Sequence, residues 1–386
     1  MPLFLIIHLS LFTYIMIFLT YNDAPDGIYF SQVIDVCRYW ESEFKERARL
    51  IAFISLHDFF VNKKKIRFAW PDSFVFPMVP GIENWRLNIS RLRAYFWFRK
   101  KENVIARGVF ATLLALECKK IKKVCFDARG AYNAEWTEYL INHSPTLSSG
   151  MKELEKEALL KPDFRLAVSQ KLVDYWKTEY NYTLSSHVLI PCTLDSSSCG
   201  YYDKDAAMAI RQGFNVKKNE ILLVYSGSSA QWQSFEKMEE YITKAFHQNP
   251  NIKLLLLAKA GIEKSLAEQF PGRIMQAWVK PDEVNTYLSA ADYGLLIRAP
   301  SVTNAVSSPV KFAEYLAAGL QVVISDNIGD YSHFVKEKGC GMLADSVSWG
   351  NLQRPAENEK LRIQEIAKFC FTKATYKEDY RKIREM

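Results

Sequence analysis

Lys311 and Glu314 lie three residues apart in the segment SSPVKFAEYLAAGLQVVIS, residues 307–325. This spacing places two side chains on one face of a helix. A lysine near a phosphate and a glutamate near a ribose diol is one use of such a face, because a carboxylate can accept two hydroxyl hydrogen bonds of about 1.5–3 kcal/mol each. The alternative is a solvent-exposed ion pair that contributes less than about 0.5 kcal/mol. Helix spacing alone favours the ion pair.

The residues around this pair predict a helix over residues 309–318. Pro309 suits the first helical position, Ser308 is the expected N-cap, and Gly319 is the expected stop. The apolar run QVVIS then follows as a buried strand. The unpaired N–H groups at the start of such a helix form a site for an anion.

Other charged or small residues stand directly beside runs of the strand type. They are Arg107, Asp127, Arg129, Gly227 and Arg298, together with Gly27, which precedes the first helical pattern. Ligands of open α/β sheets bind beyond the carboxyl ends of the strands, so these residues are candidates for binding. The alternatives are a buried Asp–Arg pair at Asp127, a structural arginine at 298 and plain turns at the two glycines.

The elements that must position these residues follow the rhythm of parallel β/α units. The strand candidates are IMIFL, LIAFISL, ENVIA, KKVCFD, FRLAVS and HVLI, then EILLVYSG, IKLLLLA, RIMQAWV, YGLLI and QVVIS. The rhythm breaks near Pro191. We therefore expect an α/β protein of two doubly wound, Rossmann-like domains facing a cleft, over residues 14–190 and 191–365. A C-terminal helix within residues 366–386 could pack back on the N-terminal domain.

Residues 3–19 are apolar enough to suggest a signal or a membrane anchor. However, no basic segment precedes them, no small-residue cleavage site follows, and the run is shorter than the usual span of about 20 residues. A polar loop and a helical pattern come directly after it. We therefore predict that residues 14–19 form the first buried strand.

Composition narrows the classes of partner. The net charge of +7 is modest and no recognition motif is present, so we expect no nucleic acid. Sugar nucleotides or lipid phosphates account for the charge. The seven cysteines include no C-x-x-C, which favours the reducing cytoplasm. No H-x-H or H-E-x-x-H occurs, and the D-K-D at Asp203 and Asp205 suits a helix cap, so we expect neither metal nor cofactor.

Residues 86–101, RLNISRLRAYFWFRKK, combine six basic and four aromatic side chains. Such a helix is typical of binding to an anionic membrane surface, here the inner face of the plasma membrane. The alternative is a helix that packs one face into the core and leaves a basic face in water.

Several segments occur in an order that resembles a known family. These are FLTYNDAPDGIYFSQV, CFDARG, AVSQKLVDYW, IPCTLD, EVNTYLSAADYGLLIR and residues 307–325. Together they resemble the family-four type retaining glycosyltransferases of GT-B architecture, over nearly the whole chain from Met16. The resemblance implies a metal-independent hexosyltransferase in polysaccharide or glycolipid biosynthesis. It would use a nucleoside-diphosphate sugar donor and a saccharide or lipid-linked acceptor.

Roles for single residues follow partly from this resemblance and partly from the positions of the residues at strand ends and on the helix over residues 309–318. Glu314 would bind the donor ribose, and Lys311 and Arg298 would stabilise the leaving diphosphate. Ser308 and Gly227 would lie against the donor. Gly27, Arg107, Asp127 and Arg129 would serve the acceptor.

Three departures from the family pattern leave alternatives open. Val306 occupies the position of a second glutamate, Gln321 replaces a proline, and YSGSSAQWQ lacks the expected arginine and lysine. The sequence is thus also compatible with a sugar-nucleotide epimerase, or with a non-catalytic protein that binds nucleotide sugars in an assembly.

Overall fold

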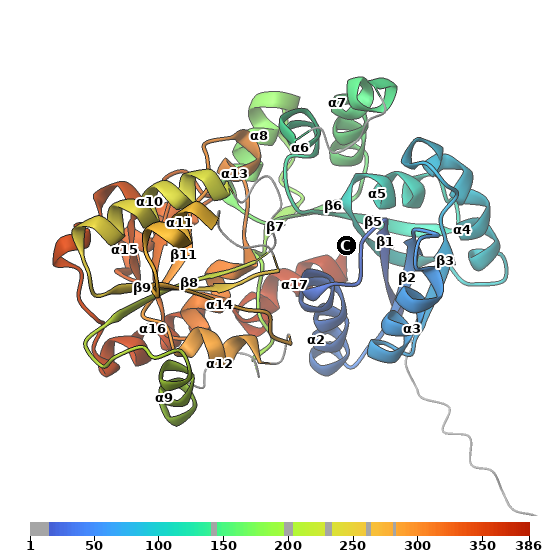
Figure 1. Ribbon diagram of the computed structural model, residues 1–386. Helices are drawn as coiled ribbons and strands as arrows, with labels where there is room; N and C mark the ends of the chain where they lie inside the picture. Colours follow the sequence, from blue (N-terminus) through green and yellow to red (C-terminus); the bar gives the residue numbers. More distant parts are fainter. Residues whose placement is uncertain (1–14, 140–144, 197–203, 228–233, 260–263, 281–282) are drawn as a thin grey trace, which may run out of the picture. The chain divides into compact units, whose positions relative to one another are not determined.

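The computed structural model describes residues 15–139, 145–196, 204–227, 234–259, 264–280 and 283–386 (Figure 1). Its contacts divide the chain into two compact units. The first unit comprises Met1–Asp127, Lys161–Phe164 and Ile383–Met386, and the second comprises Ala128–Leu160 and Arg165–Lys382. Within the described ranges, no helix has both the length and the apolar composition that crossing a membrane requires.

The first sheet has seven strands in the order β3-β2-β1-β4-β5-β6-β7. The strands are β1 Ile15–Tyr21, β2 Arg47–Ile54, β3 Ser73–Pro77, β4 Glu102–Arg107, β5 Ile121–Ala128, β6 Phe164–Ala167 and β7 His187–Leu189. β1 lies centrally and pairs in parallel with β2 and β4. The predicted strand at the start of the chain is therefore confirmed from Ile15 onward, whereas residues 1–14 lie outside the described part.

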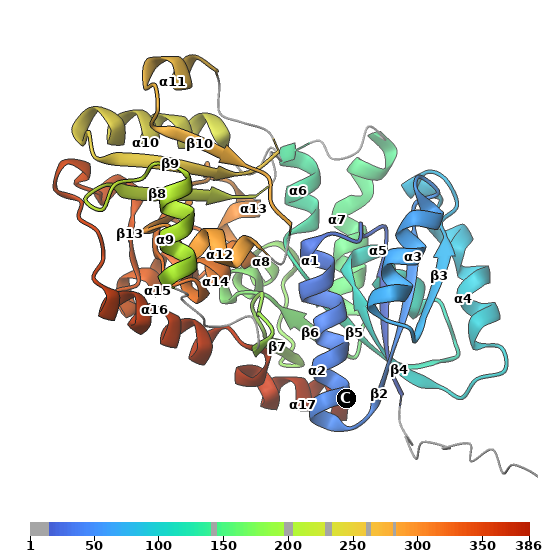
Figure 2. The same cartoon turned by 60° about the horizontal axis from the view of Figure 1, so that its bottom comes forward.

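Both faces of this sheet are covered by helices, which explains why its strands read as unbroken apolar runs. The helical segments are α1 Gly27–Tyr29, the π-helical turn η1 Phe30–Ile34, α2 Asp35–Phe44, α3 Phe59–Ala69, η2 Ile82–Asn88, α4 Ile89–Phe96, α5 Gly108–Leu116, α6 Tyr132–Tyr139, α7 Pro145–Leu160 and α8 Gln170–Tyr180. α2 and α3 cover one face of the β1 and β2 region, and α5 covers the other (Figures 1 and 2). Accordingly, Phe18 of β1 contacts Trp40 of α2, and Tyr21 contacts Phe110 of α5.

The basic segment 86–101 divides into a packed part and an exposed part. Leu92, Tyr95 and Phe96 of α4 are buried, as the core-packing alternative expects. Arg99 is half-buried, with its guanidinium 4.0 Å from the ring centroid of Tyr95. Trp97 and Phe98, which follow α4, are exposed.

The second sheet has six parallel strands in the order β10-β9-β8-β11-β12-β13. The strands are β8 Ile221–Ser226, β9 Ile252–Leu257, β10 Ile274–Ala277, β11 Tyr293–Leu296, β12 Gln321–Ile324 and β13 Gly341–Leu343. The α-helices are α9 Lys204–Gly213, α10 Phe235–Gln248, α11 Lys264–Gln269, α12 Val284–Ser289, α13 Val302–Ala305, α14 Val310–Ala317, α15 Tyr331–Lys338, α16 Glu357–Cys370 and α17 Lys377–Glu385. Figure 2 shows α10 on one face and α12 and α14 on the other. The expected Rossmann-like α/β architecture is confirmed in both sheets.

Helix α14 shows one correct and one wrong expectation about capping. Gly319 has a φ of +79°, and the N–H groups of Gly319 and Leu320 donate to the carbonyls of Leu316 and Tyr315, which is the predicted C-terminal stop. At the other end Pro309 is the N-cap residue and no side chain caps the helix. Ser308 is therefore not the N-cap. Its Oγ accepts from the Cys192 N–H at 2.9 Å and contacts Tyr331 Oη at 2.6 Å. The Ser308 hydroxyl is thus engaged by residues distant in the sequence and does not cap the helix.

Tyr315 joins α14 to the sheet at one fixed position. Its ring lies so close to Gly294 that a Cβ there would come within 2.4 Å of Tyr315 Cδ2. Its hydroxyl accepts from Ser226 N at 3.0 Å and donates to the Leu295 carbonyl at 3.3 Å. The end of β8, the middle of β11 and one turn of α14 are thereby connected by a single buried side chain.

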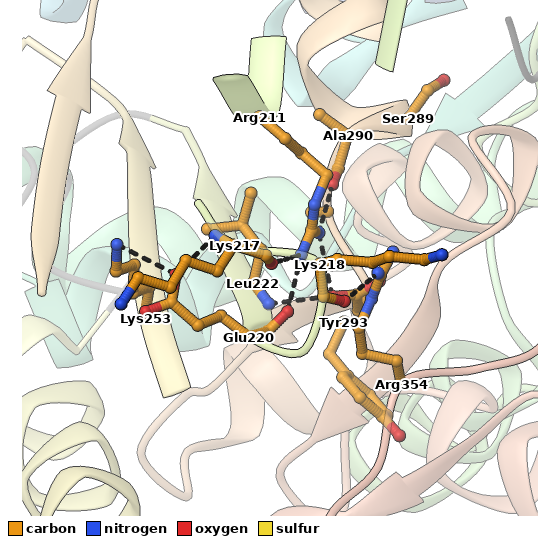
Figure 3. Close-up of polar contacts among 12 residues, drawn as sticks. Arg211, Lys217, Lys218, Glu220, Leu222, Lys253, Ser289, Ala290, Tyr293 and Arg354 are labelled. Atoms are coloured by element: carbon orange, nitrogen blue, oxygen red, sulfur yellow. Dashed lines mark hydrogen bonds and ion pairs between the residues drawn. The ribbon is translucent and has the colours of Figure 1, made fainter. Parts of the chain in front are cut away.

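A charged cluster closes the amino end of the second sheet (Figure 3). Asp292, directly before β11, is fully buried, and its carboxylate lies 3.1 Å from Arg211 Nη1, 3.2 Å from Arg354 Nε and 3.7 Å from Lys360 Nζ. It also accepts from Leu222 N at 2.9 Å. The same three side chains also donate to backbone carbonyls. Arg211 donates to the carbonyl of Glu220, Arg354 to that of Lys218, and Lys360 to that of Ala291. Every cation here therefore has both a carboxylate and a carbonyl partner.

Candidate functional site

Arg298 lies just beyond the carboxyl end of β11, where an α/β sheet binds its ligands. Its side chain is buried, and its backbone N–H donates to Ser325 Oγ, which follows β12, at 2.9 Å. Its Nη1 donates to Asn304 Oδ1 at 3.2 Å and to Ser307 Oγ at 3.4 Å. The guanidinium is thus held in place by neutral groups.

No ion pair connects Arg298 to a carboxylate anywhere in the described ranges, and its Nε is buried without a hydrogen-bond partner. Burial lowers the pKa of Arg298 to about 10, so it is still charged at neutral pH. An uncompensated buried cation is unfavourable, and an orphaned donor adds to that cost. A phosphate is the ligand that would satisfy both, because guanidinium groups form paired, charge-assisted hydrogen bonds with phosphate oxygens.

The short helix α13 holds the partner of Arg298. The Asn304 side chain donates from Nδ2 to Tyr139 Oη at 3.3 Å, and Tyr139 Oη contacts Ser301 Oγ at 3.1 Å. The carboxylate of Glu138 accepts from the backbone N–H groups of Val302 and Thr303 at 2.7 and 3.1 Å. The last two residues of α6 therefore fix the start of α13, and through Asn304 they fix Arg298.

Lys311 and Glu314 form the ion pair that their spacing predicts. Lys311 Nζ lies 2.7 Å from Glu314 Oε2, and the two side chains are 26% and 27% exposed. The pair is therefore neither fully solvated nor buried. Gly227 directly follows β8, and its N–H donates to the Leu257 carbonyl at 3.3 Å.

A second charged group lies at the carboxyl ends of β1, β4 and β5 in the first unit. Arg107 Nε is 3.5 Å from Asp23 Oδ1, and Arg107 Nη1 is 3.7 Å from Asp127 Oδ2. Burial raises the pKa of Asp23, although Arg107 acts in the opposite direction. Asp23 and Asp127 thus both lie within 4 Å of Arg107, and their carboxylate oxygens are acceptors for a hydroxyl hydrogen bond.

The two remaining predicted residues are Gly27 and Arg129. Gly27 begins α1 and is exposed, with Asp26 capping the helix by accepting from Tyr29 N at 3.0 Å. A Cβ at position 27 would meet no atom within 4 Å, so packing does not require a glycine. Arg129 belongs to the second unit, and its Nη2 lies 3.9 Å from Cys192 Sγ.

Sequence reasoning missed Asp23 and the residues that hold Arg298. Asp23 follows β1 by two residues, so the strand-end rule that selected Asp127 could have found it. Ser307, directly before Ser308, accepts the hydrogen bond from Arg298. Gly329 explains how tightly that loop packs, because a Cβ there would come within 1.9 Å of the Ser307 carbonyl. No local sequence pattern pointed to Tyr139.

The fold has well-matched counterparts among solved structures. Anabaena HepE in complex with UDP and glucose superposes with a TM-score of 0.71 at 14% identity, over 96% of this chain and 99% of that chain. The sucrose-phosphate synthase of Thermosynechococcus elongatus gives 0.70 at 13% identity, over 96% and 98%. The lipopolysaccharide outer core galactosyltransferase WaaB gives 0.65 at 11% identity, over 96% and 99%. No family model and no curated protein matches the sequence.

At these identities the similarity establishes the fold alone. The chain has the pair of Rossmann-like domains found in GT-B glycosyltransferases, and the match extends over nearly the full length of each structure compared.

Proposed function

We propose that this protein is a glycosyltransferase that takes its sugar from a nucleoside-diphosphate donor bound by the second unit. The observation that carries the proposal is Arg298, a buried guanidinium at the carboxyl end of β11 that pairs with no carboxylate among the described residues. The fold shared with enzymes such as HepE, whose structure holds UDP and glucose, supports the same function.

In the proposed mechanism Arg298 binds the donor diphosphate. Negative charge builds up on that group as the glycosidic bond breaks, and a cation already held by Asn304 and Ser307 needs no rearrangement to stabilise it. Lys311 supplies a second positive charge. Glu314 exchanges its ion pair with Lys311 for the two hydroxyls of the ribose, while Ser308 and Gly227 lie against the donor.

The acceptor is assigned to the first unit and is a saccharide or a lipid-linked saccharide. Asp127 and Asp23 would accept its hydroxyl hydrogen bond, and Arg107 would bind an acceptor phosphate, with Arg129 and Gly27 nearby in the sequence. Following the family resemblance, the reaction retains the anomeric configuration. The leaving phosphate then takes the proton of the attacking hydroxyl as the new C–O bond forms. The enzyme would work without a metal, at the cytoplasmic face of a membrane.

One observation favours a second candidate, a non-catalytic protein that binds nucleotide sugars. Val306 takes the place of the second family glutamate, and its side chain is only 3% exposed, with its carbonyl accepting from Ser169 Oγ at 2.7 Å. No carboxylate is thus available at that position to contact the transferred sugar.

Calorimetric titration tests the donor site. A thermal-shift panel of nucleoside-diphosphate sugars selects the donor, which is then titrated into wild type, Glu314→Ala and Lys311→Ala. Loss of two charge-assisted hydrogen bonds in Glu314→Ala should lower donor affinity about 10²-fold, close to 3 kcal/mol. Lys311→Ala should lower kcat more than affinity, because its charge matters most as the diphosphate leaves.

A purely structural ion pair makes a different prediction. Both variants would then bind the donor like wild type, with stability reduced by less than about 0.5 kcal/mol. Donor hydrolysis without acceptor separates an enzyme from a binding protein: a protein that binds the donor tightly but never turns it over would replace the transferase with the second candidate.

A further inference from the structure

Helix α3 exposes an unusual combination of aromatic and basic side chains. Phe60 is 84% exposed and Phe68 is 90% exposed, and Lys64 lies between them at four-residue spacing, so the three form one stripe. Val61, Lys65 and Arg67 flank this stripe and are also exposed. These six residues are called the α3 face. Ile66 is the buried residue that anchors the opposite side of the helix.

The charge of the chain is concentrated around this helix. Residues 59–101 contain ten basic side chains and two carboxylates, Asp72 and Glu83, for a net charge of +8. The whole chain carries +7, so the remainder is slightly negative. Asp72 is already paired with Arg47 and Arg49. α3 itself contains four basic residues and no acidic one.

A second exposed cluster follows α4. Phe98 is 94% exposed and Trp97 is 68% exposed, and the exposed Lys100 and Lys101 follow after Arg99. Phe98, Phe68 and Phe60 are the three most exposed large apolar side chains in the described ranges. α3 and α4 precede and follow β3, the edge strand of the seven-stranded sheet. Exposed rings and excess positive charge thus occur on the same part of the fold.

We propose that the α3 face binds the surface of an anionic lipid bilayer. Phenyl rings have no polar group to hydrate and gain by insertion between acyl chains, whereas the lysines and Arg67 contact the lipid phosphates. The two rings lie about 12 Å apart along the helix axis, so both can enter one interface when α3 lies flat on it. The inference does not depend on the donor site, and it extends the membrane surface expected from residues 86–101 to a helix outside that segment.

Vesicle co-sedimentation of the full chain tests this proposal. Vesicles of phosphatidylcholine and phosphatidylglycerol in equal parts should bind the protein, and vesicles of phosphatidylcholine alone should not. Lys64→Glu combined with Phe68→Ser should weaken binding at least about tenfold, because it removes a ring and reverses a charge. The matched control is Lys368→Glu with Phe369→Ser, an exposed Lys–Phe pair on α16 of the second unit.

The proposal holds if only the α3 variant loses binding while both variants keep the wild-type melting temperature. Unchanged binding by the α3 variant would overturn it and place the attachment elsewhere, for example in residues 1–14. Equal loss in the control would also overturn it, since any Lys–Phe pair would then suffice. So would the absence of binding to either vesicle, or a wild-type dimer in sedimentation velocity that the α3 variant abolishes.

Discussion

The buried charged residues at the two ends of β11 differ in whether they have partners of opposite charge. Asp292 stands directly before the strand, surrounded by Arg211, Arg354 and Lys360 at 3.1–3.7 Å. Arg298 stands just after it and is also buried, and within the described ranges its side chain donates only to the neutral oxygens of Asn304 and Ser307. A strand of four residues separates a fully compensated charge from an uncompensated one.

This difference distinguishes charges that serve the fold from charges that serve a ligand. At the amino end, cations from α9, α16 and the segment between β13 and α16 meet one carboxylate, so the cluster fastens distant parts of the chain together. At the carboxyl end the protein holds a guanidinium in place, and the part of the chain that the structure describes supplies no counter-ion. Removing a charge at the first site should therefore cost stability, and removing one at the second should cost binding.

Asp292→Asn should produce the largest effect. It leaves three cations, two of them buried, around a neutral amide, and breaking a buried pair in this way costs about 3–5 kcal/mol. Urea denaturation measures the free energy of unfolding directly. A loss below about 1 kcal/mol would mean that the cluster is hydrated and would remove the contrast with Arg298.

Arg298→Met should have the opposite result, with stability kept and ligand affinity lost. Methionine fills similar space without a charge, so the free energy of unfolding should stay within about 1 kcal/mol of wild type or rise. Affinity for the selected nucleotide sugar should fall about 10²-fold, close to 2.7 kcal/mol. Calorimetry and denaturation on the same preparation give both values. A large loss of stability in a variant that still folds and binds the ligand with wild-type affinity would make Arg298 a structural residue like Arg211.

Tyr139→Phe should have the smallest effect. It tests how firmly Arg298 is held at the carboxyl end of β11. The variant loses the hydroxyl that contacts Ser301 and Asn304, so Arg298 is held less firmly and affinity should fall about threefold to tenfold. In an Arg298→Met background the same change should have no further effect on affinity. Additive losses in this double-mutant cycle would show that Tyr139 acts independently of Arg298.

The sequence predicted the fold well because parallel strands buried on both faces are continuous apolar runs. The two strands it missed are short and lie at sheet edges. β3, SFVFP, ends in a proline, and β13, GML, has three residues beginning with a glycine. Such segments carry little of the pattern that identifies a strand.

The site was only partly predictable because local spacing fixes some contacts and long-range packing fixes others. The Lys311–Glu314 pair and the Gly319 stop follow from neighbours in the sequence. The prediction that Ser308 is an N-cap was wrong because its hydroxyl hydrogen-bonds to Cys192 and Tyr331, which are far away in sequence. The partners of Asp292 come from positions 211, 354 and 360, which no local pattern joins.

The contact between Gly294 and Tyr315 has a consequence for how this sequence can diverge. A side chain at position 294 would collide with the Tyr315 ring, so no larger residue is tolerated there while the ring remains. Loss of the ring would in turn leave a void beneath β11 and free the Ser226 N–H. Among homologues the two positions should therefore change together, with a bulkier residue at 294 appearing only where 315 has become small.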